Sequence, residues 1–120
     1  MGTTHVTAIV RNPADGHRAW RGEFLVDTGA FDCLVPANRL REIGLVPKGK
    51  RAYELADGSE VMLDITTGEI EFEGEIVGST LIFGPDGAEP ILAVTALESA
   101  GFEVDPRTQQ LKRLPAVRLK

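Results

Sequence analysis

Long hydrophobic runs, paired cysteines and an excess of basic charge are all missing from this chain of 120 residues. No stretch approaches the ~18 apolar residues that a membrane-spanning helix requires, and the first residues lack the basic start and apolar run of a signal peptide. The single cysteine, Cys33, excludes an internal disulfide bond and fits a reducing compartment. These absences predict a cytoplasmic protein that has no membrane partner.

Positive charge and metal ligands are also sparse. The 13 Lys and Arg residues are outnumbered by 18 Asp and Glu residues, and the net charge of −5 argues against a nucleic-acid partner. Basic residues concentrate only at 112–113 and 118–120, where a solvated chain end accounts for them. One cysteine and two isolated histidines, His5 and His17, lack the spacing of zinc ligands. We therefore expect no metal and no cofactor, and we expect both histidines at the surface.

Turn-forming residues are plentiful by contrast. Together, 13 glycines and 7 prolines divide the chain into short apolar runs, which is typical of a mainly β domain, barrel or sandwich. The expected strands are 5–11, 18–26, 51–55, 60–65, 69–73, 76–83, 102–104 and 110–114. Short helices are expected at 38–43, with Asn38 as candidate N-cap and Gly44 as its end, and at 94–100, closed by Gly101. The length fits one domain spanning residues 1–120.

One turn carries residues that can perform chemistry. The apolar segment Phe24-Leu25-Val26 leads into Asp27-Thr28-Gly29-Ala30, and a second apolar stretch follows at 33–35. A strand that delivers a carboxylate, a hydroxyl and a glycine into a tight turn is how an aspartic protease presents its catalytic carboxylate. The triplet alone is weak, because average composition gives a chain of this length roughly a 3% chance of containing one. A hairpin turn capped by the Asp side chain is the alternative.

Three segments together resemble the retropepsin-like aspartic proteases, the single-domain family of clan AA, and in particular its small prokaryotic members. The segments are 24–36 around Asp-Thr-Gly, 55–58 (Leu-Ala-Asp-Gly), and 89–98 with 101–106. They occur in the family's order and span nearly the whole chain. The resemblance implies a closed β-barrel of the acid-protease type with one half-site per chain, so that the active form is a homodimer.

The resemblance also implies a role for each matching position. Asp27 would supply the catalytic carboxylate, Thr28 would hydrogen-bond across the two-fold axis, and Gly29 would let the backbone approach the substrate. Residues 55–60 would form a flap that closes over bound peptide and excludes water. The substrate-binding residues implied are Ala30, Phe31, Asp32, Ala56, Asp57, Gly58, Ile91 and Leu92. The chain ends would help to hold the two subunits together.

The implied chemistry needs two carboxylates. Two carboxylates roughly 3 Å apart cannot both ionise and so share one proton. The ionised one takes a proton from a bridging water, and the protonated one donates to the scissile carbonyl oxygen of a peptide or unfolded protein. A Ser or Thr at position 30 could stabilise the ionised form by donating a hydrogen bond, but Ala30 cannot. We therefore expect activity at mildly acidic pH.

Some positions depart from the family or leave alternatives open. Ala93 stands where the family usually has glycine, and its added methyl could crowd the Asp27 turn. Phe31 replaces the first of two aspartates found in retroviral members and is either a pocket wall or part of the core, whereas Asp32 matches the second. Cys33 is either a buried small hydrophobe or a redox switch. Trp20 serves packing or a dimer contact.

Three hypotheses of different classes remain at this point. The leading one is a homodimeric aspartic endopeptidase that cleaves extended peptide segments. The alternative is a catalytically silent retropepsin-like dimer that binds peptides or serves as an assembly module. The third is an unrelated β-barrel with a chance Asp-Thr-Gly turn, which predicts a monomer at all concentrations.

Overall fold

The structure is a computed structural model that describes residues 3–116 and 119. Within these residues the chain is mainly β, with nine strands and two short helices. In chain order the elements are β1 (His5–Asn12), β2 (Asp15–Asp27), β3 (Cys33–Pro36), α1 (Ala37–Glu42), β4 (Gly49–Glu54), β5 (Glu60–Phe72), β6 (Glu75–Gly84), β7 (Ile91–Ala93), α2 (Val94–Ala100), β8 (Phe102–Asp105) and β9 (Gln110–Arg113). The mainly β prediction is confirmed.

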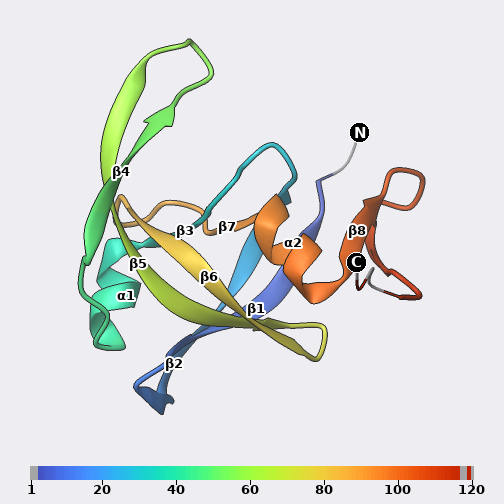
Figure 1. Cartoon of the computed structure of the whole chain (residues 1–120), viewed down its shortest axis with the longest axis horizontal. Coiled ribbons are helices and arrows are strands. Elements are labelled where there is room, and N and C mark those ends of the chain that lie inside the picture. Colours follow the sequence, from blue (N-terminus) through green and yellow to red (C-terminus); the bar gives the residue numbers. More distant parts are fainter. Residues whose placement is uncertain (1–2, 117–118, 120) are drawn as a thin grey trace.

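Seven strands form one curved sheet in the order β1-β2-β7-β3-β6-β5-β4 (Figure 1). Because β1 also pairs with β5, through register pairs such as Val10 with Ile70, the pairings run in a ring of six strands with β4 outside it. The narrowest joint of this ring is between β3 and β7, where the register holds only Leu34 opposite Ile91. We describe the arrangement as a ring of pairings rather than as the closed barrel predicted from the sequence.

The core is built from one face of these strands and from the two helices. Buried and more exposed residues alternate along β1, which places Val6, Ala8 and Val10 on one face. The largest side chains that are essentially inaccessible are Phe24, Phe72, Leu40, Ile70, Leu81, Leu92 and Leu97. Each such side chain contributes about 1.5–3 kcal/mol through burial. Trp20 packs against Phe24, with ring centroids 5.9 Å apart, which fits the packing role expected for it.

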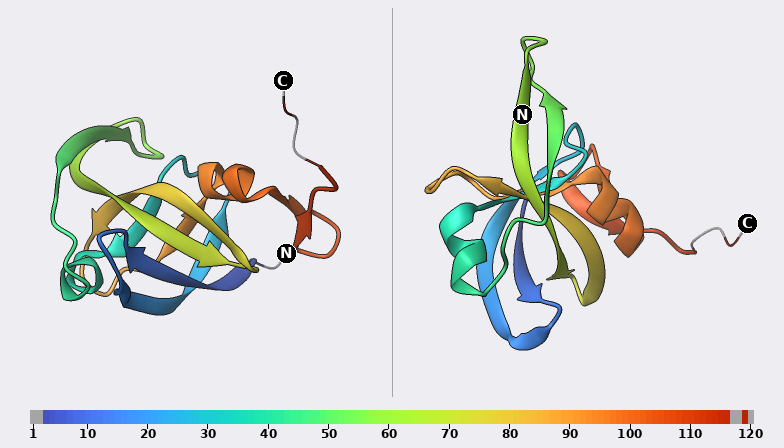
Figure 2. Two further views of the ribbon diagram at one scale, coloured as in Figure 1. Left: turned by 60° about the horizontal axis from the view of Figure 1, so that its bottom comes forward. Right: turned by 60° about the vertical axis from the view of Figure 1, so that its left-hand side comes forward.

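The β4–β5 hairpin extends beyond the rest of the molecule (Figures 1 and 2). The prediction of separate strands at 60–65 and 69–73 was wrong, because β5 runs without interruption from Glu60 to Phe72. Gly68 lies inside it, opposite Ser79. A Cβ on Gly68 would come within 2.6 Å of the Leu81 Cδ1 atom, so this glycine serves close packing rather than a turn.

The two helices follow the predicted places, with one correction. Helix α1 begins at Ala37, one residue earlier than expected, and Asn38 does not cap it with its side chain. Instead the Asn38 backbone N–H donates to the Asp86 carboxylate, 3.0 Å away, so a distant loop caps this helix end. The prediction of α2 over residues 94–100 is confirmed, and Gly101 ends it in the left-handed region (φ 79°).

A separate two-stranded sheet, β8–β9, follows α2 and confirms the predicted last hairpin to within one residue at each strand. Phe102 anchors it in the core, and the Arg113 guanidinium lies 4.7 Å from the Phe102 ring centroid. Arg113 also donates to the Glu75 carboxylate at 2.8 Å, which ties the hairpin to β6. Lys112 and Arg113 are exposed, while the expected solvated end at 118–120 falls outside the described residues except for Leu119. Among the described residues, neither helix has the length and hydrophobicity needed to cross a membrane.

Candidate active site

Asp27 ends β2 at the point where two distant parts of the chain run side by side. β2 pairs in parallel with β7, with Leu25 opposite Ile91, Val26 opposite Leu92 and Asp27 opposite Ala93. Parallel pairing brings the carboxyl ends of both strands to the same edge. The Asp-Thr-Gly turn is therefore built against the segment that leads into α2.

Hydrogen bonds from the backbone shape the turn after β2. The Gly29 N–H donates to Asp27 Oδ1 at 2.9 Å, and the Ala30 N–H donates to the Asp27 carbonyl oxygen at 3.1 Å. The Ala30 carbonyl accepts from the N–H of Val94 at 3.0 Å, which fixes the turn to the first residue of α2. Asp27 is half-buried, whereas Thr28 and Gly29 are exposed. The result is an oriented carboxylate at the protein surface.

Ala93 and Cys33 support this turn from inside. The side chains of both residues are fully buried, and the Ala93 N–H donates to Cys33 Sγ at 3.3 Å. The backbone of Ala93 is extended (φ −90°, ψ 166°), so an alanine adopts it without strain and glycine is not required. Burial raises the pKa of the Cys33 thiol, while hydrogen bonds from Ala93 and Ser79 oppose the effect. Cys33 thus sits as a buried thiol in the core.

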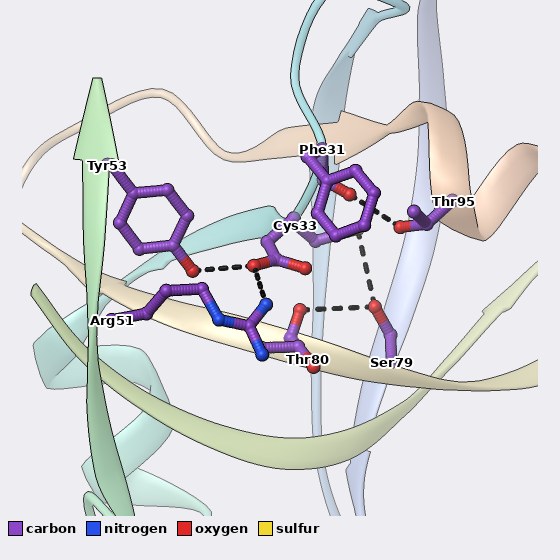
Figure 3. Close-up of polar contacts among 8 residues, drawn as sticks. Phe31, Cys33, Arg51, Tyr53, Ser79, Thr80 and Thr95 are labelled. Atoms are coloured by element: carbon purple, nitrogen blue, oxygen red, sulfur yellow. Dashed lines mark hydrogen bonds and ion pairs between the residues drawn. The ribbon is translucent and has the colours of Figure 1, made fainter. Parts of the chain in front are cut away.

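The two residues after Ala30 face different surroundings. Phe31 is 65% exposed, so it is not a core residue, and its carbonyl accepts from Thr95 Oγ1 at 2.6 Å. Asp32 is buried, and its Oδ2 accepts two hydrogen bonds, from Arg51 Nη1 at 2.6 Å and from the Tyr53 hydroxyl at 2.6 Å. Figure 3 shows Arg51 and Tyr53 pointing from β4 toward the same carboxylate. Asp32 therefore joins the end of the turn to strand β4 of the β4–β5 hairpin.

The cluster of Asp32, Arg51 and Tyr53 perturbs the ionisation of its members. The hydrogen bond with Asp32 raises the pKa of Arg51, so the guanidinium stays charged. Burial and the hydrogen bond to Asp32 raise the pKa of the Tyr53 hydroxyl well above its ordinary value, so it stays a donor. The Arg51–Asp32 ion pair is uneven in exposure, with 43% of the Arg51 side chain exposed against 4% of the Asp32 side chain.

A cavity of about 420 Å³ opens beside the Asp27 turn. It is lined by Gly29, Ala30, Phe31, Asp32, Leu34, Arg51, Ala52, Tyr53, Glu54, Ile82 and Ile91. A second cavity, of about 280 Å³, shares Phe31, Asp32 and Arg51 with the first and is otherwise lined mainly by hydroxyl-bearing residues of β6 and α2. The first cavity is mostly apolar, so it suits an apolar side chain.

The structure brings some of the residues expected from the sequence together and leaves others apart. Gly29, Ala30, Phe31, Asp32 and Ile91 line the larger cavity. Leu92 is fully buried in the core and lines neither cavity. Residues 56–58 lie at the exposed tip of the β4–β5 hairpin, and Asp27 and Thr28 lie in the turn beside the cavity rather than in its lining. The sequence reasoning did not single out Arg51 and Tyr53.

The hairpin tip is a well-formed turn. Leu55 and Ser59 close it through a backbone hydrogen bond of 2.8 Å, and Gly58 occupies the left-handed region (φ 86°). The Asp57 carboxylate accepts from the hydroxyl of Ser59 and from its N–H, and these two bonds lower the pKa of Asp57. The predicted tip is confirmed as a structural element.

Metal ligands do not gather in the part of the chain that the structure describes, where no group of three His, Cys, Asp or Glu side chains is placed to hold an ion. His5 is exposed and pairs with the Glu89 carboxylate at 2.9 Å. His17 is exposed as well. Both histidines thus lie at the surface, as expected.

The architecture is similar to the retropepsin-like fold of foamy virus protease. The solution structure of the simian foamy virus (mac) protease aligns with a TM-score of 0.56 and 17% identity over 78% of this chain and 91% of that chain. The foamy viral protease–reverse transcriptase, solved with an RNA/DNA hybrid, aligns with a TM-score of 0.57 and 14% identity over 79% of this chain and 11% of that chain. A scan against protein-family models and a search of curated proteins found no match. At these identities the likeness establishes the fold alone.

Proposed function

We propose that this chain is a homodimeric aspartic endopeptidase. The observation that carries the proposal is the position of Asp27, whose carboxylate is held by the Gly29 N–H at the surface end of β2, next to the cavity of about 420 Å³. The retropepsin-like fold supports it, since the turn and the β4–β5 hairpin lie in one domain with that fold. The extended backbone of Ala93 does not require the glycine that the family usually has at this position.

Each chain would contribute half of the catalytic site. The Asp27 carboxylates of two copies would share a proton, one activating water and the other polarising the scissile carbonyl. Thr28, which is exposed, would bond across the two-fold axis, and the tips of the hairpins would close over an extended peptide. Main-chain hydrogen bonds would give affinity, and cavities beside the turn would give selectivity. The same proposal has three further parts. The sheet closes into a barrel, the chain is related to small prokaryotic members of the family, and the protein is cytoplasmic.

The decisive experiment compares the wild-type protein with Asp27→Asn, which keeps the shape of the side chain but removes its ionisation. Each protein is incubated with an unfolded protein substrate between about pH 3 and pH 7, a range that includes pH values at which a carboxylate pair shares one proton. We expect cleavage by the wild type, strongest at mildly acidic pH because Ala30 cannot donate to the carboxylate, and none by the variant.

Two outcomes would contradict the proposal. If both proteins leave the substrate intact but bind it, the chain is the silent peptide-binding module. If both cleave it equally, the cleavage does not come from Asp27. A rate maximum near pH 2 would refute the expectation based on Ala30 alone.

A further inference from the structure

The larger cavity contains a charged pair whose charges cancel within the chain. Arg51 and Asp32 both line it, and both also line the second cavity, so the pair lies between the two spaces. The Arg51 Nη1 atom and the Asp32 Oδ2 atom are 2.6 Å apart. Apolar side chains, among them Leu34, Ile82 and Ile91, make up much of the remaining lining.

Asp32 is the buried member of the ion pair, and Arg51 is the exposed member. The Asp32 side chain is only 4% exposed, whereas 43% of the Arg51 side chain is exposed. Tyr53 donates to the same carboxylate oxygen as Arg51 and fixes its orientation. Both donors lie on β4 and bond the same Asp32 oxygen, Oδ2. This arrangement points to an indirect role of Asp32 in substrate selection, through the charge of Arg51, beside the direct contact expected from the sequence.

We propose that Asp32 is a specificity-determining residue that neutralises Arg51 and so makes this cavity a subsite for an uncharged, apolar side chain of the peptide. This inference rests on the proposed function, because it names the substrate class of the same site. Without the Asp32 charge, the exposed guanidinium would attract an acidic side chain. Without the Arg51 charge, Asp32 would favour a basic one. Tyr53 acts through Asp32 and is a positioning residue.

One other charged side chain lines the larger cavity and has to be separated from this effect. Glu54 is an exposed residue at the end of β4 and belongs to the lining. Its charge is the same in every variant considered below. For each variant, we take the ratio of its affinities for two peptides that differ only in charge. Comparing this ratio between variants removes the contribution of Glu54.

The test uses the full chain and short peptides in which Glu, Gln or Lys replaces each position in turn. Binding is measured by fluorescence anisotropy with the Asp27→Asn change present, so that no peptide is cleaved, and kcat/KM is measured with Asp27 intact. We expect Asp32→Asn to raise the preference for Glu over Gln at one peptide position by about fivefold, as for a partly exposed ion pair. The double variant with Arg51→Met should lose this gain.

Two further variants make the result specific. Arg51→Met alone should shift the preference at the same position toward Lys, and it decides the matter if Asp32→Asn does not fold. Asp64→Asn is the matched control, because it frees Lys50 from an ion pair of 2.8 Å on the same hairpin, and neither residue lines the two cavities. The control should leave all preferences unchanged.

The outcomes separate this inference from the proposed function. Folded variants with unchanged charge preferences, or an absence of any peptide binding, would overturn the role of Asp32. A charge switch in binding without cleavage by the wild type would uphold that role and refute the protease proposal. Cleavage by the wild type with no charge switch would refute the role of Asp32 and uphold the protease proposal.

Discussion

Asp32 and Cys33 are neighbours in the chain, and their side chains join the segment after the Asp27 turn to two different strands. Asp32 binds Arg51 and Tyr53 of β4, and Cys33 accepts the N–H of Ala93 on β7. The position of the turn is therefore set by two buried groups that follow it directly.

The buried thiol gives the protein a testable sensitivity to alkaline pH. Burial raises the pKa of Cys33 above its ordinary value of 9.0, so the folded state keeps the proton where the unfolded chain loses it. The stabilisation from the neutral thiol is complete below that ordinary value and is lost as pH rises through the higher folded-state pKa. We expect the wild-type free energy of unfolding to fall more steeply above about pH 9 than that of Cys33→Ala.

Denaturant unfolding at a series of pH values from about pH 7 to pH 10 measures this difference. Cys33→Ala should also be less stable at neutral pH, by about 1 kcal/mol, because the Ala93 N–H loses its acceptor. Parallel slopes for the two proteins above pH 9 would show that the thiol does not ionise on unfolding in this way.

Residue identities in the turn could be read from the sequence, but their partners could not. The Asp27 turn follows from the local pattern of apolar and turn-forming residues. The ion pair of Asp32 depends on Arg51, 19 positions away, and on how β4 lies over the turn. The residues around Arg51 in the sequence do not indicate that its guanidinium pairs with Asp32.

At the scale of elements, the β4–β5 hairpin is joined to the rest of the domain through both of its strands. Asp32 joins β4 to the turn, and β5 also pairs with β6 and β1. The tip of the hairpin is held by the short hydrogen bonds around Asp57 and Ser59.

The tip should therefore depend on Asp57. We expect Asp57→Ala to speed hydrogen exchange at the Leu55 and Ser59 amides, because the carboxylate no longer accepts from Ser59. The lowered pKa of Asp57 keeps the carboxylate ionised below its ordinary value of 3.8, so the wild-type tip should keep its protection at mildly acidic pH and lose it only as pH falls through the lower value.

Amide exchange measured by NMR between about pH 3 and pH 6 tests both expectations, with Asp64→Ala as a control at the root of the same hairpin. The control should change exchange near Lys50 and leave the tip unaffected. Equal exchange at Ser59 in the wild type and Asp57→Ala would refute the role of the carboxylate.

The elements themselves were predictable where their signals are local. Alternating apolar and polar residues, together with turn-forming residues, predicted the hairpins. Gly101 predicted the end of α2. The strands β3 and β7 were not predicted as strands, because they are short and pair in parallel with partners far along the chain. The cap of α1 was missed for the same reason, since it comes from Asp86.

At the scale of the whole molecule, the retropepsin-like fold and a single Asp-Thr-Gly turn per chain lead to a prediction about mixtures. If both carboxylates of a dimer are needed, a wild-type subunit paired with Asp27→Asn is inactive. An equal mixture that exchanges subunits freely should therefore keep about a quarter of the activity of undiluted wild-type protein at the same total concentration.

Cleavage assays on a series of mixing ratios, with sedimentation of each mixture, test this. Activity should follow the square of the wild-type fraction. A linear dependence would mean that one chain suffices, and a monomer by sedimentation at all concentrations would contradict the homodimer proposal. Asp64→Asn mixed in the same way is the control and should leave activity unchanged.

The parallel alignment of β2 with β7 also bears on when the site can form as the chain folds. The contact between Cys33 and Ala93 joins positions 60 residues apart, so closing it requires most of the intervening chain to be ordered or looped out. The hairpins β1–β2 and β5–β6 depend on nearer contacts and can form earlier. A ribosome-bound chain that ends before β7 would already contain Asp27 but would lack β7 and α2, so the turn takes its final surroundings only after residues 91–94 have been made.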